Sequence, residues 1–598
     1  MEAEIESNSY GSFKLWSELE LEEFADKLVF KSVESPDQGF CINRFDGNID
    51  KLDNDIGEGP SGSPKVSTVY GVAGTIRLLA GTYVMVITSR KEVGNYLGFP
   101  VFLVTSMKFI SCNEASRNLT NQEKRDEDYF MTLLKTIEST PGLYYSYRTD
   151  ITLNLQRRCK LAKGWESKPI WKQGDPRFVW NRNLLEELIE NKLDEFIIPL
   201  LQGSFQTGEL KLKDSPAIIK IVSRRCTRRL GTRMWRRGAN LEGDAANFIE
   251  TEQLLEFKDR ISSFLQVRGS IPLLWEQIVD LSYKPHLQLI NHENTSMVAE
   301  RHFNDLLKCY GGCIVVDLTD KHGDEGMLST AYEEEMQKHP NVRYVSFDFH
   351  QSCGHGNFDN IQLLYDKISE DFEKQGYFLL DSEGKILAEQ EGVVRSNCID
   401  CLDRTNVTQV GVHSYLAQKS LNSQLQRIGA ISSTESISMF SEDFEVFKTL
   451  WVEHGDEISL EYSGTHALKR DLVRYGKQTL SGIIKDGISA LSRYYLNNFQ
   501  DGVRQDAIDL ICGHYTVSRI RPSPLQPKAI DTLSYLPIAS ALVIGGLAVT
   551  SITLNQAGRN AQQYLSSVVC AGLTAGLMAV VKANGRQICS RPRLCGLF

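Results

Sequence analysis

Several common ligand-binding and processing signals are absent from the 598-residue sequence. It contains no G-x-x-x-x-G-K-S/T motif and no G-x-G-x-x-G followed by the expected acidic residue, so the two commonest nucleotide-binding loops are excluded. The first residues, MEAEIESNSYGSF, have neither a basic nor an apolar region, and we expect no cleavable signal peptide. Positive charge is not in excess: 66 basic and 76 acidic residues give a net charge of -10, which argues against bulk nucleic-acid binding. An anionic ligand must therefore be held by a local basic site.

The overall composition is that of a globular protein. Apolar residues make up 41% and charged residues 24%, which excludes a disordered, collagen-like or coiled-coil chain. The length predicts two or three domains. Thirteen cysteines spread over the chain are typical of the reduced thiols of a cytosolic protein.

Two long apolar runs stand near the C-terminus. Leu533–Leu554 has no charged residue, and Tyr564–Val581 follows after a short polar break. Because a helix needs about 20 apolar residues to cross a bilayer, with about 17 as the minimum, residues 532–582 are predicted to form two transmembrane helices. Only Arg559 lies between the runs, whereas basic residues stand on both flanks, so both flanks are expected in the cytosol. The alternative is one spanning helix followed by a buried amphipathic helix.

The rest of the chain divides by pattern into an α/β protein, α+β overall. Residues 1–180 carry short β-like runs and a helical stretch near 122–140, which predicts a β-rich N-terminal domain. Residues 181–512 form the second domain, where strands and helices alternate beyond residue 300 and favour a largely parallel or mixed sheet. A Pro-rich tether is expected over 513–531, and a basic cytosolic tail over 583–598.

A C-x5-R-T sequence lies between a predicted strand ending at Asn397 and a helix beginning soon after Cys401. A short strand-to-helix loop can turn its backbone N–H groups inward around an anion, and the helix N-terminus adds positive potential. Arg404 can then bind two phosphate oxygens with its planar guanidinium. The same field lowers the pKa of the Cys398 thiol, while Thr405 can donate a hydrogen bond to the thiolate. The loop thus has the parts needed for phosphoryl transfer through a cysteinyl-phosphate.

Other interpretations of the loop remain open. Cys398 and Cys401 also form a C-x-x-C, which could be a redox pair or half of a zinc site. Partners for such a zinc site would be the pair Cys309 and Cys313, or Cys353 with His355. Cys398 could equally be an inert buried cysteine.

The segment RSNCIDCLDRTNV resembles the signature of the Sac-domain phosphoinositide phosphatases, R-x-N-C-x-D-C-L-D-R-T-N. Further similar blocks begin at Tyr70, Gly231, Gly269 and Leu491, so the resemblance covers most of residues 70–510. It implies a β-rich N-terminal Sac domain packed on an α/β cysteine-phosphatase-like catalytic domain. With the apolar hairpin it resembles the membrane-anchored subclass of endoplasmic reticulum and Golgi. The expected substrate is then monophosphorylated phosphatidylinositol, foremost phosphatidylinositol 4-phosphate, at an anionic membrane surface and without a metal or other cofactor.

The residues of the loop receive the following roles. Cys398 is the expected nucleophile, Arg404 the phosphate clamp and Thr405 a hydrogen-bond donor to sulfur. Asp400 is the candidate general acid, and Asp403 is either a second catalytic carboxylate or a helix cap. The remaining loop positions are expected to line the phosphate cradle: Ile399, Cys401 and Leu402.

A second group of candidates is basic. Residues 223–238 contain seven arginines, of which Arg236 and Arg237 are expected to face the membrane or the active-site mouth. Lys469 and Lys477 could neutralise lipid phosphates or lie on solvated helix faces. In another block, Asn247 and Glu250 could support the catalytic loop or serve only its local structure.

Two other functions remain possible. A protein-tyrosine or dual-specificity phosphatase shares C-x5-R, although such enzymes usually carry His where this chain has Asn397. A catalytically weak phosphoinositide-binding membrane tether would retain the fold with little turnover.

Overall fold

The computed structural model describes the ranges 13–52, 63–112, 119–212, 215–354, 360–410, 415–438, 441–475, 478–520, 523–525 and 561–596. The first predicted membrane helix, Leu533–Leu554, lies outside the described residues, as do Lys477 and His355.

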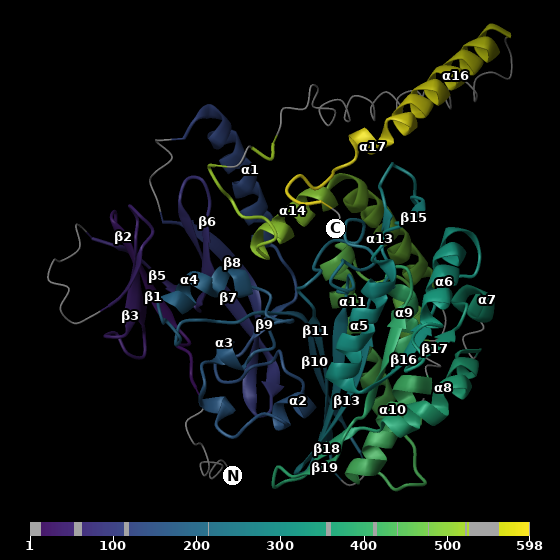
Figure 1. Cartoon of the computed structure of the whole chain (residues 1–598), viewed down its shortest axis with the longest axis horizontal. Helices are drawn as coiled ribbons and strands as arrows, with labels where there is room; N and C mark the ends of the chain where they lie inside the picture. The colour runs from purple at the N-terminus through teal and green to yellow at the C-terminus, as the bar shows by residue number, and fades with distance from the viewer. Residues whose placement is uncertain are drawn as a thin grey trace.

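A small antiparallel sheet forms the N-terminal end of the molecule (Figure 1). Its strand order is β4-β3-β2-β1-β5. Phe30 and Phe40 stack on neighbouring strands, and Phe40 also meets Phe196 edge-on, which joins this sheet to the rest of the N-terminal half. The five strands are β1 (Leu19–Glu23), β2 (Lys27–Ser32), β3 (Gly39–Asn43), β4 (Ile49–Lys51) and β5 (Lys65–Val69).

A large sheet runs through both predicted domains. Along the order β17-β16-β20-β13-β12-β11-β10-β9-β8-β7-β6, pairing is parallel from β17 to β13 and antiparallel from β13 to β6. The short strands β18 and β19 extend it beside β13, while β14 and β15 form a separate hairpin. The bounds are β6 (Val72–Arg77), β7 (Thr82–Tyr96), β8 (Phe99–Ser111), β9 (Leu143–Tyr145), β10 (Leu201–Leu210), β11 (Ala217–Arg225), β12 (Ile249–Phe257), β13 (Arg260–Arg268), β14 (Trp275–Gln277), β15 (Leu287–Leu289), β16 (Gly312–Asp317), β17 (Val342–Ser346), β18 (Phe378–Leu380), β19 (Ile386–Ala388) and β20 (Gly392–Asn397).

Helices cover both faces of the parallel end of this sheet (Figure 1). Alternate residues of β16 explain why: Ile314 and Val316 enter a core with α8 (Ile361–Gln375), α10 (Tyr415–Ile428) and α11 (Glu442–Ser463). Cys313 and Val315 enter the opposite core with α5 (Thr295–Tyr310) and α6 (Gly323–Met336). A strand that is apolar on both faces must be covered on both faces, as in other α/β proteins.

The helical stretch expected in the N-terminal half is present. The stretch expected near 122–140 is α1 (Asn121–Glu138), which begins with a capping box between Thr120 and Glu123. α9 (Asp403–Val410) contributes Val407 to the core around α8, α10 and α11. The remaining longer helices are α12 (Arg470–Tyr475), α13 (Leu480–Phe499), α14 (Asp501–Ile511) and α16 (Ala561–Ala583). Short helices are α2 (Leu155–Cys159), α3 (Ile170–Gln173), α4 (Glu186–Glu190), α7 (Phe349–Cys353) and α17 (Gly585–Ile588), with 3-10 turns η2 (Trp165–Ser167) and η3 (Arg182–Leu185).

The C-terminal segments partly pack on the folded body. In the predicted tether, Arg519 donates to Leu79 O and the Ser523 hydroxyl donates to Asp126, so its described part lies against the α1 region. The segment Gly585–Gly596, here called the C-terminal segment, packs beside α14, where Asp506 accepts the backbone N–H of Arg593. The predicted tail is thus folded onto the protein over this length.

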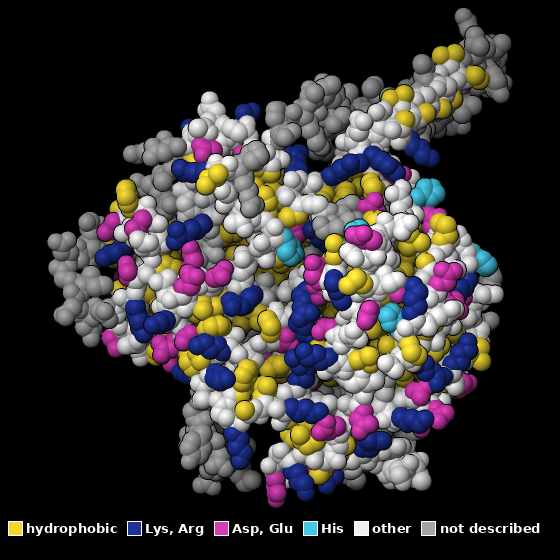
Figure 2. All heavy atoms as spheres, viewed as in Figure 1, with side chains coloured by type: hydrophobic (Ala, Val, Ile, Leu, Met, Phe, Trp, Pro, Cys, Tyr) yellow, Lys and Arg dark blue, Asp and Glu magenta, His cyan; other side chains and the backbone are white. Residues whose placement is uncertain are grey.

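The second predicted membrane segment is helical. It coincides with α16, which projects from the molecule with apolar side chains on its surface, among them Val568, Val569 and Val580 (Figure 2). Among the helices that the structure describes, however, none combines the length and apolarity that a membrane crossing requires.

Candidate active site

The C-x5-R-T sequence forms a loop at the carboxyl end of the parallel strands. β20 lies between β16 and β13 and ends at Asn397, and α9 begins at Asp403. The strand-to-helix junction predicted from the sequence is therefore confirmed. Asn397 Nδ2 donates to Asp317 Oδ1 at 2.7 Å on the neighbouring strand, which fixes the start of the loop. Ligand sites of α/β proteins lie at this edge of the sheet.

Cys398 lies at the base of the loop, with 2% of the residue exposed. The backbone N–H of Cys401 donates to Cys398 Sγ at 3.1 Å, and the Thr405 hydroxyl lies 3.5 Å from the same sulfur. Burial would raise the pKa of this thiol, but a hydrogen bond from Cys401, the charge of Arg404 and the hydrogen bond from Thr405 lower it to about 6. Burial and the adjacent Cys398 hold the pKa of Cys401 well above its ordinary value. Near neutral pH the loop therefore carries its thiolate at Cys398, the nucleophilic form of cysteine.

Arg404, expected to clamp phosphate, is bound to carboxylates of the chain instead. Its Nη1 donates to Glu325 at 2.8 Å and to Asp320 at 3.2 Å, and its Nη2 donates to Glu325 at 3.1 Å. Asp320 follows β16, which pairs in parallel with β20, so the connections after the two strands lie side by side. The two carboxylates neutralise a largely buried guanidinium. In this conformation Arg404 is therefore paired with carboxylates, and its role as a phosphate clamp stays a prediction.

Asp400, the candidate general acid, lies between two arginines. Arg233 Nη2 donates to Asp400 Oδ2 at 2.6 Å, and Arg237 Nη1 donates to Asp400 Oδ1. Burial opposes ionisation of Asp400, but the charges and hydrogen bonds of Arg233 and Arg237 hold its pKa well below the ordinary value. A general acid must carry a proton near the working pH. In this conformation the carboxylate ties the loop to residues 233–237, and the acid role of Asp400 stays a prediction.

Asp403 anchors the first turn of α9. Its Oδ1 accepts the backbone N–H of Leu468 at 2.7 Å, and its Oδ2 accepts Arg493 Nη1 at 2.9 Å. A carboxylate in the first turn also interacts favourably with the helix dipole. These contacts agree with a structural role for Asp403.

The other loop positions differ in what they offer a ligand. Ile399 turns its carbonyl to Arg237 Nη1 at 3.1 Å. Leu402 is fully buried against Ile249, Ile458 and Tyr462, so only its backbone could take part in a phosphate cradle. Cys401 adopts the left-handed φ of +52°, which turns its N–H toward the Cys398 sulfur.

The two arginines expected at a membrane surface are buried. Arg236 is 5% exposed, and its Nη2 donates to both oxygens of Asp509 at 2.8 Å. Arg237 is 3% exposed and bridges the catalytic loop to Gln277. Burial of both arginines contradicts the membrane-facing alternative, because an arginine-rich segment that forms internal ion pairs has the same sequence pattern as a basic surface. Of the two, Arg237 contacts the loop, at Ile399 and Asp400, which agrees with the alternative at the active-site mouth.

The remaining candidates lie at different places. Lys469 has a left-handed φ of +61°, and its backbone N–H donates to Asp486. Asn247 Nδ2 donates to the carbonyl of Asp400 at 3.3 Å and so supports the loop. Glu250 pairs instead with Arg224 inside the sheet. Lys477 lies outside the described residues.

Sequence reasoning missed several residues around the loop. Arg268, at the end of β13, donates to Asn406 Oδ1 at 2.5 Å, and burial lowers its pKa to about 10 although Cys401 and Cys398 act in the other direction. Arg233 was part of the arginine cluster but was not assigned to Asp400. Glu325 and Asp320, which hold Arg404, lie some 80 residues away in the chain. Only their positions just after β16 could have suggested them.

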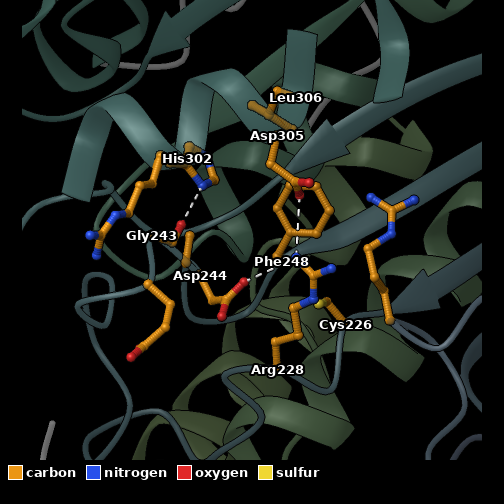
Figure 3. A pocket seen from close by; sticks show the side chains of 12 residues that line it. Cys226, Arg228, Gly243, Asp244, Phe248, His302, Asp305 and Leu306 are labelled. Atoms are coloured by element: carbon orange, nitrogen blue, oxygen red, sulfur yellow. Dashed lines mark hydrogen bonds and ion pairs between the residues drawn. The ribbon is translucent and has the colours of Figure 1, made fainter. Parts of the chain in front are cut away.

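A chain of polar contacts supports the strand that precedes the loop. Arg395 Nη1 donates to Asn397 Oδ1, and Arg395 Nε donates to His302 Nε2 at 3.0 Å. Burial and the charge of Arg395 hold the pKa of His302 well below its ordinary value, so the neutral ring donates from Nδ1 to Gly243 O. His302 lines a cavity of about 160 Å³ (Figure 3). Arg228 in its wall contacts Asp244 and Asp305, so acidic partners on the chain itself face this arginine.

Metal ligands do not gather in the part of the chain that the structure describes. No three side chains of His, Cys, Asp or Glu lie close enough there to hold an ion.

The comparisons with known proteins agree with this geometry. The SacI homology domain matches residues 70–354. The phosphoinositide phosphatase SAC8 of Arabidopsis thaliana is 66% identical over 99% of each chain. This chain belongs to the Sac phosphoinositide phosphatase family. The phosphatidylinositol-3-phosphatase SAC1-A of Danio rerio is 36% identical, over 90% of this chain and 91% of that protein. SAC1 of Saccharomyces cerevisiae, with the same description, is 32% identical over 89% of this chain and 86% of that protein.

Membership confirms the resemblance on which the expectations above rest. A Sac phosphatase carries out phosphoinositide hydrolysis, and the mixed α/β fold contains the Sac domain.

Proposed function

We propose that this chain hydrolyses monophosphorylated phosphatidylinositol, foremost phosphatidylinositol 4-phosphate, through a cysteinyl-phosphate at Cys398. The observation that carries the proposal is the Cys398 thiol, whose pKa is lowered to about 6 at the carboxyl end of β20. The printed names of the SAC1 relatives specify the 3-phosphate, so the ring position is the first property to measure.

The proposed reaction has two steps. The Cys398 thiolate attacks phosphorus, the bond from phosphorus to the inositol oxygen breaks, and that oxygen leaves with a proton. Water then attacks the cysteinyl-phosphate, releasing inorganic phosphate and restoring the thiolate. Arg233 and Arg237 hold the pKa of Asp400 well below its ordinary value, so Asp400 can supply the first proton only if substrate binding changes these contacts; otherwise the proton comes from water.

Arg404 must change partners during this cycle. A phosphate monoester brings two negative charges and several acceptor oxygens, which can replace the carboxylates of Glu325 and Asp320 around the guanidinium. Arg404 and the loop amides can stabilise the charge of the transition state, and we propose that no metal ion takes part.

A lipid panel tests the function. The wild type and Cys398→Ser are compared on phosphatidylinositol 3-, 4- and 5-phosphate and on a phosphotyrosine peptide, with EDTA present, by measuring released phosphate. We expect turnover of the lipids, highest for the 4-phosphate, and its loss in Cys398→Ser but not in Cys159→Ser, which alters a half-buried cysteine on α2.

Three results would contradict the proposal. Turnover of phosphotyrosine above that of every lipid would favour a protein phosphatase. Loss of activity in EDTA would overturn metal independence. No lipid turnover by the wild type would favour a weakly active tether. The covalent step is tested separately by acid-quenching the enzyme on labelled lipid, which should leave label on Cys398.

We further propose that the chain resides in endoplasmic reticulum or Golgi membrane with its catalytic domain and both termini in the cytosol. The proposal rests on the family resemblance and on the uncharged run Leu533–Leu554. Protease protection of tags at either terminus in isolated microsomes tests it: both tags should be digested without detergent, and protection of either would refute the topology.

A further inference from the structure

Helix α13 (Leu480–Phe499) carries a continuous apolar stripe on the surface of the protein. The side chains at 480, 484, 488, 491 and 495 follow each other at intervals of four, four, three and four residues, which places them on one face of a helix. All five are more than half exposed: Leu480 (78%), Ile484 (60%), Ile488 (60%), Leu491 (73%) and Tyr495 (52%). Ile483, beside the stripe, is 52% exposed. Single apolar side chains on a surface are ordinary, but a contiguous group of this kind marks an interaction surface.

The opposite face of α13 is bound to the catalytic loop. Arg493, 4% exposed, donates from Nη1 to Asp403 Oδ2 at 2.9 Å and from Nε to Thr465 at 2.8 Å. Asp403 is the first residue of α9, five positions after Cys398. A partner bound to the apolar stripe of α13 would therefore be separated only by this helix from Asp403, which anchors the loop that carries Cys398.

The end of α13 is also where the C-terminal segment returns to the protein. The backbone N–H of Ser590 donates to Asn498 O at 2.7 Å, and Cys589 Sγ lies 3.3 Å from Asn498 Oδ1. This segment follows α16, and α17 lies near α13 and α14 in Figure 1, whereas α16 projects away from the molecule. Ser523, in the last described part before α16, binds Asp126 of α1, which packs against α14. The described residues on either side of the C-terminal apolar region therefore include contacts with α1 and with the end of α13.

We propose that the exposed face of α13 lies on the lipid bilayer, with its apolar side chains inserted at the boundary between headgroups and acyl chains. A bilayer is the occupant that fits best. The stripe is apolar with an exposed lysine, Lys485, beside it, as in helices that lie in the membrane interface. The substrate of a Sac phosphatase is itself in the membrane, so the inference rests on the proposed function. Insertion places α9 and Cys398 next to the lipid headgroups and presents the loop to a substrate that cannot leave the bilayer.

A direct test is photo-crosslinking in the full chain, reconstituted in liposomes of phosphatidylcholine with phosphatidylserine. A benzophenone amino acid replaces Ile488 on the stripe, or Leu363 on α8 as a control that is 53% exposed. We expect lipid adducts by mass spectrometry at position 488 at about tenfold the level at 363, because only an inserted side chain meets acyl chains. Equal adduct levels overturn the proposal. So do crosslinks from 488 to a second copy or to residues of the same chain.

A kinetic test separates membrane docking from catalysis. The triple substitution Ile484→Ser, Ile488→Ser and Leu491→Ser should lower turnover of long-chain phosphoinositide in the bilayer about tenfold, since each removes an inserted apolar side chain. Turnover of a soluble short-chain phosphoinositide should stay within about twofold, because none of these side chains touches the loop. The matched control replaces three other exposed apolar residues by serine: Met327, Leu363 and Leu387.

The crosslinking and kinetic experiments distinguish failure of the membrane-docking proposal from failure of the proposed phosphatase function. Equal losses on both substrates would mean that the stripe serves the fold of the site, and no loss on either would mean that it does not dock. Both results overturn the inference on α13. If the wild type hydrolyses neither substrate, the proposed function fails, while the crosslinking result still decides whether α13 lies on lipid.

Discussion

In the proposed mechanism, catalysis depends most directly on the ionisation of Cys398. We predict that its thiolate forms with a midpoint near pH 6, against an ordinary value of 9.0. A shift of three pKa units corresponds to about 4 kcal/mol in favour of the thiolate. Burial opposes the shift, so the hydrogen bonds of Cys401 and Thr405 and the charge of Arg404 must exceed the cost of burial by this amount.

The assay is the absorbance of thiolate at 240 nm, measured from pH 4.5 to 9 as the difference between the wild type and Cys398→Ser. Burial raises the pKa of most other described cysteines, for example Cys112 to about 12 and Cys353 to about 11, so they contribute little to the difference. Arg404→Gln removes the charge but keeps a polar side chain, and should raise the midpoint by about one unit or more. A wild-type midpoint at or above 8.5 would refute the reasoning, as would an unchanged midpoint in Arg404→Gln.

The same shift has a consequence for stability. Between about pH 6 and 9 the folded chain carries the thiolate while the unfolded chain binds a proton at this residue, so the unfolded state holds more protons. The stabilisation is complete above pH 9 and is lost as the pH falls through 6. In urea denaturation the free energy of unfolding of the wild type should therefore rise more from pH 6 to 9 than that of Cys398→Ser. Parallel curves would contradict the shift.

Three further predictions concern an ion pair of Arg404, a buried ion pair on α14 and the packing of the C-terminal segment. Glu325→Gln weakens the ion pair that competes with substrate for the catalytic arginine, so kcat/KM on lipid should rise about threefold or more; a fall would show that the carboxylate assists the reaction. Arg236→Met removes the arginine partner of the buried Asp509, which then keeps contacts with Gln505 and His514, and should cost about 3 kcal/mol in urea denaturation, with recovery when Asp509→Leu is added; an unchanged stability would refute the pair. In Gly502→Ala the new Cβ would lie 2.5 Å from the backbone of the C-terminal segment, so that segment should become sensitive to trypsin. The control is Gly487→Ala, where nothing lies within 4 Å of the new Cβ. Equal cleavage of the two variants would contradict the packing.

The sequence predicts the site best where the signal is local. A β run ending at Asn397 and a helical pattern after Cys401 are enough to place the loop, because strand and helix periodicities differ and the junction is short. The sulfur contacts of Cys401 and Thr405 also arise within the same loop. The alternation of strands and helices beyond residue 300 was also predicted, although not the bounds of every helix.

Contacts between distant segments could not be predicted in this way. Nothing in the sequence near Arg404 shows that β16 pairs in parallel with β20, yet this pairing brings Asp320 to the guanidinium. The expectation that Arg236 and Arg237 could face a membrane failed for a related reason. Composition shows that charges are present but not which carboxylates face them, and Asp509, which binds Arg236, is 273 positions away. Burial of these arginines follows from pairing that only the fold supplies.

The charges around the loop are balanced within the protein itself. Arg404 is matched by Glu325 and Asp320, and Asp400 lies between Arg233 and Arg237. Because desolvated charges are costly when unpaired, an arginine that waited unpaired for phosphate would destabilise the fold. Substrate binding is then an exchange of ion pairs, whose net free energy is smaller than that of the new contacts alone. Such an exchange favours a ligand with two negative charges, which can replace two carboxylates at once. Because the exchange stabilises the bound substrate only weakly, interactions that strengthen in the transition state lower the activation barrier and raise the rate.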